Sequence, residues 1–155
     1  MSASFSVEPI GVVTCPRTEP IDDDWDAIIS TIELDPARFT PDALRGLADF
    51  SHLEVVYLFH LVDPARWETA ARRPRNNPDW PEVGIFAQRA KRRPNRIGIC
   101  TCSLLSVSGL EVVVRGLDAI DGSPVLDLKP YMDEFGPRGE IRQPAWSRAL
   151  MDGYW

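Results

Sequence analysis

Short runs of β-type sequence separated by turn-forming residues recur along this chain, and they constrain its fold more than any other feature. The run at 53–61 is nearly continuous in β-branched and aromatic residues, which is typical of a strand buried on both faces. Ser108-Gly109 separates two other runs and indicates a hairpin turn. We expect strands within residues 6–14, 28–34, 53–61, 83–87, 97–107 and 110–120.

Helical patterns are rare by comparison. The segment 41–48 starts with Pro41 after Thr40 as the expected N-cap, and the segment 145–151 follows Pro144. Strands and helices do not alternate, and no G-x-G-x-x-G follows a strand, which argues against a doubly wound nucleotide-binding sheet. With 14 prolines and many short strands, the sequence predicts an all-β fold, a closed antiparallel or mixed barrel.

Length and composition fit one globular domain. The chain has 155 residues, of which 44% are hydrophobic and 26% charged. No apolar run approaches the roughly 18 residues of a membrane-spanning helix, and the N-terminus shows no secretory signal pattern, so we expect a cytoplasmic protein. Cys15, Cys100 and Cys102 lack zinc-ligand spacing, so we expect buried, reduced thiols and no metal.

The charge is unevenly distributed. The net charge is −6, yet residues 66–96 contain nine basic residues against three acidic ones, a local charge of +6. The proline-rich stretch 64–81, which overlaps this basic segment, predicts a long loop. A basic middle on an acidic body can bind a phosphate backbone, although a solvated charged loop has the same composition.

The densest basic segment, residues 88–98, joins two predicted strands. Pro94 favours an extended Arg93, and guanidinium groups held on such a loop fit phosphate. A surface loop kept soluble by its charge is the alternative. If the loop binds RNA, the phosphate contacts come from Lys91, Arg92, Arg93 and Arg96.

A second candidate segment follows the Asp121-Gly122 turn signal. Asp127, Lys129 and Tyr131 alternate and therefore share one face of an extended segment, which Pro130 places at a strand end or sheet edge. An acid, an amine and a phenol at a barrel rim could order a substrate and move a proton, or form a salt bridge that closes the fold.

His60 ends an apolar strand, where a lone histidine is more often a hydrogen-bonded core residue than a functional one.

Several motifs together resemble one family, the TsaA-like (YaeB/TrmO) methyltransferases of N6-threonylcarbamoyladenosine in tRNA, in its single-domain branch. The resemblance covers about residues 7–131. The motifs are P-I-G-V-V at 9–13, G-L-A-D-F-S-H-L at 46–53, F-H at 59–60, V-G-I-F-A-Q-R at 83–89, R-P-N-R-I-G at 93–98 and G-L-D-A-I-D-G-S-P-V-L-D-L-K-P-Y at 116–131.

The resemblance implies a closed six- to seven-stranded barrel over residues 1–131, with a tail at 132–155 that carries a short helix and belongs to the same domain. It implies a homodimer that binds S-adenosylmethionine near the subunit interface and methylates N6 of the modified adenosine beside the tRNA anticodon. A non-catalytic S-adenosylmethionine-binding barrel and a methyltransferase with another acceptor are the alternatives. The implied cofactor contacts are His60, Arg89, Ile99, Asp121, Gly122, Ser123 and Pro124.

This chain departs from the family pattern in three places. Arg96 stands where the family usually has the second proline of R-P-N-P-I-G, residues 21–26 form an acidic loop, and the tail 134–147 resembles single-domain relatives. For catalysis we hypothesise that Asp127 or Tyr131 takes a proton from the acceptor nitrogen, with Lys129 stabilising the anion that forms.

Overall fold

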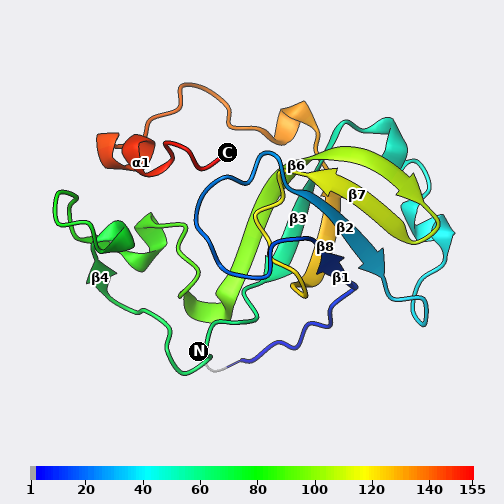
Figure 1. Ribbon diagram of the computed structural model, residues 1–155, viewed down its shortest axis with the longest axis horizontal. Coiled ribbons are helices and arrows are strands. Elements are labelled where there is room, and N and C mark those ends of the chain that lie inside the picture. Colours follow the sequence, from blue (N-terminus) through cyan, green and yellow to red (C-terminus); the bar gives the residue numbers. More distant parts are fainter. Residues whose placement is uncertain (1–2) are drawn as a thin grey trace.

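A closed six-stranded barrel organises residues 3–155, the part of the chain that this computed structural model describes (Figure 1). Neighbouring strands pair in the order β1-β2-β7-β6-β3-β8, all antiparallel, and β8 pairs back with β1 to close the cylinder. The predicted closed all-β barrel is therefore confirmed. Its strands are β1 Gly11–Thr14, β2 Ile29–Leu34, β3 His52–Leu58, β6 Ile97–Ser108, β7 Glu111–Arg115 and β8 Pro124–Pro130.

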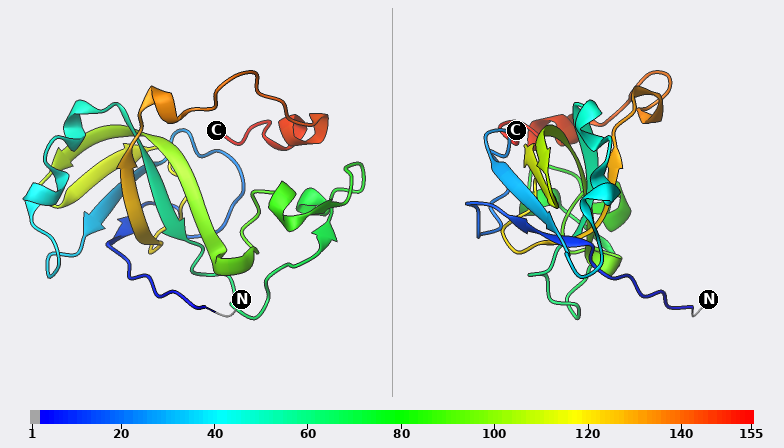
Figure 2. Two further views of the ribbon diagram at one scale, coloured as in Figure 1. Left: turned by 180° about the vertical axis from the view of Figure 1, so that it is seen from behind. Right: turned by 90° about the vertical axis from the view of Figure 1, so that its right-hand side faces the viewer.

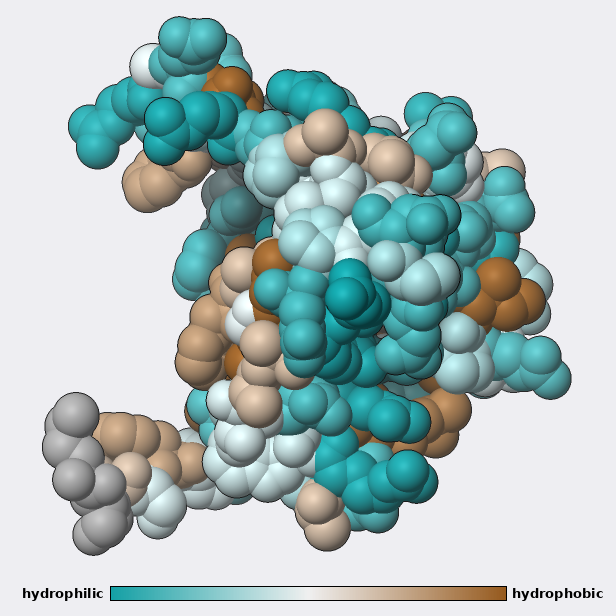
Figure 3. Space-filling model, turned by 90° about the vertical axis from the view of Figure 1, so that its left-hand side faces the viewer, coloured by the Kyte–Doolittle hydropathy of each residue, from teal (hydrophilic) through white to brown (hydrophobic). Residues whose placement is uncertain are grey.

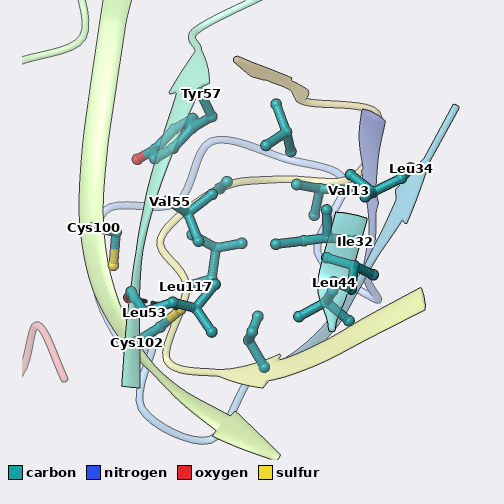
Figure 4. Packing of buried hydrophobic residues seen from close by; sticks show 14 residues of the cluster. Val13, Ile32, Leu34, Leu44, Leu53, Val55, Tyr57, Cys100, Cys102 and Leu117 are labelled. Atoms are coloured by element: carbon teal, nitrogen blue, oxygen red, sulfur yellow. Dashed lines mark hydrogen bonds between the residues drawn. The ribbon is translucent and has the colours of Figure 1, made fainter. Parts of the chain in front are cut away.

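Alternation along each strand builds the core inside this cylinder. On β3, Leu53, Val55 and Tyr57 are buried, and on β6 the thiols of Cys100 and Cys102 point into the same interior (Figure 4). The expectation of a strand buried on both faces was wrong, because the intervening positions of β3 are only partly buried or exposed. Apolar residues at those outer positions hid the alternation from the sequence.

Several predicted segments are shorter or different. The strand expected at 110–120 ends at Arg115, where Gly116 takes a φ of 77°. Only Val83–Gly84 of 83–87 is a strand (β5), and it pairs outside the barrel with β4, Ala71–Arg72. The helix expected at 41–48 is wrong, since Gly46 has a φ of 85° and separates two 3-10 turns. These turns span Pro41–Leu44 and Leu47–Asp49, and Thr40 caps neither through its side chain.

Residues 59–96 leave the barrel between β3 and β6, and the helix α1, Ala145–Leu150, projects from the same side (Figures 1 and 2). The predicted second helix is thereby confirmed. Besides β4 and β5 this excursion contains 3-10 turns at Pro74–Asn76, Ile85–Ala87 and Pro94–Arg96. A further 3-10 turn, Asp133–Phe135, follows β8. Seen from that side, the molecule is mainly hydrophilic (Figure 3).

A carboxylate at one end of the barrel joins the core to the C-terminal tail. Asp118 accepts hydrogen bonds from the hydroxyl of Tyr57 at 2.7 Å and from that of Tyr154 at 2.6 Å. The ring of Tyr57 fits only because Gly98 has no side chain, since a Cβ there would lie 2.5 Å from its Cζ. The tail is also held by main-chain bonds from Asp24 and Trp25 to the carbonyls of residues 153 and 154, at 3.1 and 3.0 Å.

Burial raises the pKa values of the buried thiols and phenols around this network. It raises the pKa of Cys102 to about 12, and the pKa values of Cys100, Tyr57 and Tyr154 are raised for the same reason, with the charge of Asp118 adding to each shift. All four groups are therefore neutral near pH 7.

We expect the free energy of unfolding to fall as the pH rises above about 8.5. Unfolded thiols titrate near pH 8.5 and phenols near pH 10, whereas these four groups keep their protons to higher pH in the folded chain. The stabilisation is complete below pH 8.5 and is lost toward pH 12, because the unfolded state then binds fewer protons. Each unit of a raised pKa contributes about 1.4 kcal/mol.

Urea unfolding at a series of pH values measures this decline. The variant Cys102→Ala lacks one of the four groups and should lose stability less steeply above pH 8.5. Equal slopes for the variant and the parent protein would contradict the prediction.

Candidate functional site

His60 and the turn at 121–124 lie against each other, although they are far apart in the sequence. His60 follows the end of β3 by two residues, and a Cβ on Gly122 would lie 3.6 Å from its Nε2. Its Nδ1 is buried and has no hydrogen-bond partner among the described residues. The interpretation of His60 as a hydrogen-bonded core residue therefore does not hold for this nitrogen.

The turn itself is held by β1 and the segment that follows it. Asp121 accepts the main-chain N–H of Cys15 on Oδ1 at 3.0 Å, and the N–H of Gly122 donates to the carbonyl of Val13 at 2.8 Å. Gly122 has a φ of 76°, a conformation that suits glycine. Ser123 is buried and Pro124 begins β8. The backbone of the turn is thus fixed beside His60.

Arg89 and Ile99 form a second pair from the predicted cofactor set. Arg89 Nη2 donates to the carbonyl of Ile99 at 2.9 Å, which ties the end of the excursion to β6. Ile99 pairs with Val56 and Ile97 with Leu58 across the β3–β6 ladder. The β3–β6 ladder therefore contains Ile99 and ends at Leu58, two residues before His60.

The three predicted catalytic residues are only partly brought together. Lys129 Nζ lies 2.5 Å from Asp127 Oδ2, so these two share the outer face of β8 as predicted, and hydrogen bonding to Asp127 raises the pKa of Lys129. Tyr131 lies beyond the end of β8, where its main-chain N–H donates to the carbonyl of His52 at 3.0 Å. Its hydroxyl lies near Gly136, where a Cβ would be 2.8 Å away.

The four predicted RNA-binding residues have different surroundings. Lys91 Nζ lies 4.0 Å from Asp22, and Arg92 is exposed. Arg93 Nη1 donates to the carbonyl of Gln88 at 2.9 Å, and Arg96 Nη1 donates to that of Val62 at 3.0 Å. The last two guanidinium groups are thus held in place by neutral carbonyls.

The departure at Arg96 has a backbone cause. Asn95 and Arg96 have φ values of 63° and 53°. Proline is restricted to a φ near −65°, so this turn excludes the second proline of the family motif.

Sequence reasoning missed the role of the acidic loop. Asp23 forms a two-fold ion pair with Arg75, at 2.6 and 3.1 Å, and the hydrogen bond from Arg75 to Asp23, followed by the charge of Asp23, raises the pKa of Arg75. The guanidinium of Arg17 donates to two main-chain carbonyls of this loop and lies 4.2 Å over the ring of Trp25. The loop therefore connects the barrel, the excursion and the tail. The sequence offered one signal for this role, the opposite charges of the acidic loop and the basic excursion.

Across residues 3–155, no group of three or more His, Cys, Asp or Glu side chains is placed to hold a metal ion. Nor does that part of the chain contain a helix long and apolar enough to cross a membrane.

Comparison with known proteins gives one consistent family. The family model of the tRNA-methyltransferase O N-terminal domain matches residues 14–136. A "Probable S-adenosyl-L-methionine-binding protein" of Methanothermobacter thermautotrophicus is 36% identical, over 86% of this chain and 94% of the relative. The tRNA (adenine(37)-N6)-methyltransferase of Escherichia coli is 32% identical, over 84% of this chain and 59% of the enzyme.

The fold comparison agrees. The crystal structure of TrmO from Pseudomonas aeruginosa superimposes with a TM-score of 0.74 at 30% identity, over 90% of this chain and 61% of that one. This chain thus spans about three fifths of the length of each of these two bacterial proteins. Because the family model covers most of the barrel and the solved structure has the same fold, the chain belongs to the tRNA-methyltransferase O N-terminal domain family.

Proposed function

We propose that this protein is an S-adenosylmethionine-dependent methyltransferase that acts on tRNA, with N6 of threonylcarbamoyladenosine beside the anticodon as the acceptor. The observation that carries the proposal is His60, whose buried Nδ1 has no partner within residues 3–155 and lies beside the fixed turn at Asp121-Gly122. An unpaired buried nitrogen is costly in the free protein and is expected to be satisfied when a polar ligand binds. The name of the Methanothermobacter thermautotrophicus relative supports the same cofactor, and that of the Escherichia coli relative supports methylation of tRNA.

The residues beside this nitrogen fit such a cofactor. Arg89 is anchored through one nitrogen to Ile99, which leaves other N–H groups for a carboxylate. Asp121 is held by the main chain of Cys15 and places negative charge near the turn, where it attracts a cationic group. Gly122 has no side chain, and Ser123 and Pro124 complete the turn. When bound, S-adenosylmethionine supplies a methyl group on a positively charged sulfur.

Proton removal from the acceptor is assigned to the outer face of β8 and the segment after it. The acceptor nitrogen is urea-like and poorly basic, so losing its proton during methylation helps the reaction. Asp127 or Tyr131 takes that proton, and Lys129, 2.5 Å from Asp127, stabilises the resulting anion. Lys91, Arg92, Arg93 and Arg96 supply contacts to the RNA phosphates.

The enzyme acts as a cytoplasmic homodimer in this proposal. Val56 and Leu58 on β3 pair with Ile99 and Ile97 on β6, and these two isoleucines are 44% and 42% exposed on the outside of the barrel. An exposed apolar row beside the proposed cofactor residues suits a subunit interface. The three cysteines are free, as in a reducing compartment.

Methyl transfer from labelled S-adenosylmethionine into bulk tRNA tests this function. We expect transfer by the purified protein, and about a hundredfold or greater loss with Asp127→Asn or Tyr131→Phe if that residue is the base. Asp49→Asn, which changes an exposed carboxylate in the 3-10 turn Leu47–Asp49, is the matched control and should keep full activity.

Calorimetry and light scattering on the same preparations separate the alternatives. Cofactor binding with transfer to protein or metabolite fractions would move the acceptor, and binding without transfer to any fraction would favour a regulatory barrel. Full activity in both variants would remove the proton-transfer assignment, and a monomer that retains activity would remove the dimer.

A further inference from the structure

A pocket on the excursion combines an indole with two arginines. It has a volume of about 280 Å³, and Pro64, Trp67, Arg93, Asn95 and Arg96 line it. Trp67 is 50% exposed, so its ring is available to a ligand. None of these residues belongs to the proposed cofactor set.

Both arginines of this pocket are held in position by neutral main-chain carbonyls and not by carboxylates that would neutralise their charge. Each uses one nitrogen, Nη1, to donate to main-chain carbonyls: Arg93 to Gln88 and Arg96 to Val62. Among the described residues, neither has a carboxylate within 4.0 Å, whereas Arg75 and Lys91 of the same excursion are paired with aspartates. The pocket therefore presents two ordered cationic groups whose remaining N–H donors suit an anion.

The backbone of the turn explains how Arg96 reaches this pocket. Asn95 and Arg96 both take positive φ values, and the carbonyl of Arg96 accepts the N–H of Phe59 at 2.8 Å. The turn is thus fixed to the residue that precedes His60. A nucleotide in the pocket would therefore contact a turn that is bonded to Phe59, the sequence neighbour of the proposed cofactor residue His60.

We infer that this pocket binds one phosphorylated nucleotide of single-stranded RNA, with the base against Trp67 and the phosphate on Arg93 and Arg96. An aromatic ring beside paired cationic groups is the combination by which proteins hold single-stranded nucleic acid. The volume is near the lower end of small-ligand pockets, about 300 Å³, and suits one nucleotide rather than a duplex. The inference deepens the proposed function by naming where a nucleotide near the methylated base is bound.

Fluorescence anisotropy with a labelled single-stranded heptaribonucleotide tests the pocket. We expect Trp67→Ala to weaken binding about tenfold to a hundredfold, and Trp67→Phe, which keeps an aromatic face, to bind nearly as the parent protein does. Arg96→Gln should weaken binding and lower the log–log salt dependence by about 0.7, the loss of one single-strand phosphate contact. Arg66→Gln is the matched control, since Arg66 is exposed, lies beside Trp67 in the chain and does not line the pocket.

Tryptophan fluorescence gives a second readout that does not depend on Trp67→Ala. Titration with 5′-AMP should quench the parent protein and leave Trp67→Phe unquenched, while adenosine and inorganic phosphate alone should bind more weakly than 5′-AMP. The inference is overturned if Trp67→Ala and Arg96→Gln bind the heptanucleotide like Arg66→Gln, or if inorganic phosphate binds as well as 5′-AMP.

Calorimetry with S-adenosylmethionine distinguishes this inference from the proposed function. Loss of RNA binding in the pocket variants with cofactor affinity unchanged supports the pocket. Cofactor binding by a protein that binds neither the heptanucleotide nor 5′-AMP overturns the pocket alone. Pocket-dependent RNA binding without cofactor binding overturns the methyltransferase proposal and leaves the pocket in place.

Discussion

Asp118→Ala is expected to lower the midpoint of thermal unfolding by roughly 6 °C, because it leaves the phenol of Tyr154 without its acceptor. Tyr57 and Tyr154 donate to its two carboxylate oxygens at 2.7 and 2.6 Å, and Tyr57 also lies 2.9 Å from the main-chain carbonyl of residue 118, an acceptor that the variant keeps. A buried donor that loses its partner costs about 1–3 kcal/mol, so the loss at Tyr154 should cost about 2 kcal/mol. For a chain of this size, each kcal/mol lowers the midpoint by about 2–4 °C.

Two further variants show whether the effect comes from the network. Tyr154→Phe removes one donor and should cost less than Asp118→Ala, and the double variant should cost less than the sum of the two, since the residues interact directly. Asp49→Ala, an exposed carboxylate, should leave the midpoint nearly unchanged. A drop of 1 °C or less for Asp118→Ala, or strict additivity with Tyr154→Phe, would show that the network contributes little.

The same network supports the proposal that residues 132–155 fold as part of the barrel domain. Tyr154 is bound to Asp118, and the main chain of the tail is bound to residues 24 and 25. The tail and barrel should then unfold in a single transition, and Asp118→Ala should make the tail more sensitive to protease in the folded state. A separate low-temperature transition of the tail in the parent protein would contradict a shared domain.

The barrel could be predicted because its strands carry local patterns. β6 and β7 are joined by a tight turn at Gly109-Leu110, one residue later than the Ser108-Gly109 signal indicated, and the apolar run at 97–107 became a long strand. The helix predicted at 41–48 is absent because Gly46 adopts a left-handed conformation that interrupts it, although Pro41 is a favourable first helical residue. The strand predicted at 83–87 was only partly correct, because a short apolar run does not reveal whether a neighbouring strand of the barrel is available for pairing.

The candidate site, too, could be predicted from the sequence only in part. His60 and Gly122, like Arg89 and Ile99, could be grouped only through motifs that resemble a family, because no local spacing brings them together. Asp118 lies inside one of those motifs, yet its contacts with Tyr57 and Tyr154 span 61 and 36 residues and leave no periodic signal. The ion pair of Arg75 with Asp23 likewise depends on how the excursion folds back.

His60→Phe should separate stability from ligand binding, and the two effects should have opposite signs. The Nδ1 of His60 is buried and has no partner in the part of the chain that the structure describes, so an apolar ring at this position removes an unsatisfied polar atom. We therefore expect thermal unfolding of the free protein at an equal or higher temperature. The affinity for S-adenosylmethionine should fall about tenfold to a hundredfold, the range for losing one hydrogen bond to a charged or buried polar group.

Two controls make the result specific to this nitrogen. His60→Asn places an amide nitrogen near the Nδ1 position and should retain more affinity than His60→Phe. The other histidine, His52, is exposed and its ring bonds to Ser51 and Ser103, so His52→Phe should leave cofactor affinity unchanged. Destabilisation of the free protein by His60→Phe, with cofactor affinity intact, would assign His60 to the core, and the unpaired nitrogen would then no longer support a binding site beside Gly122.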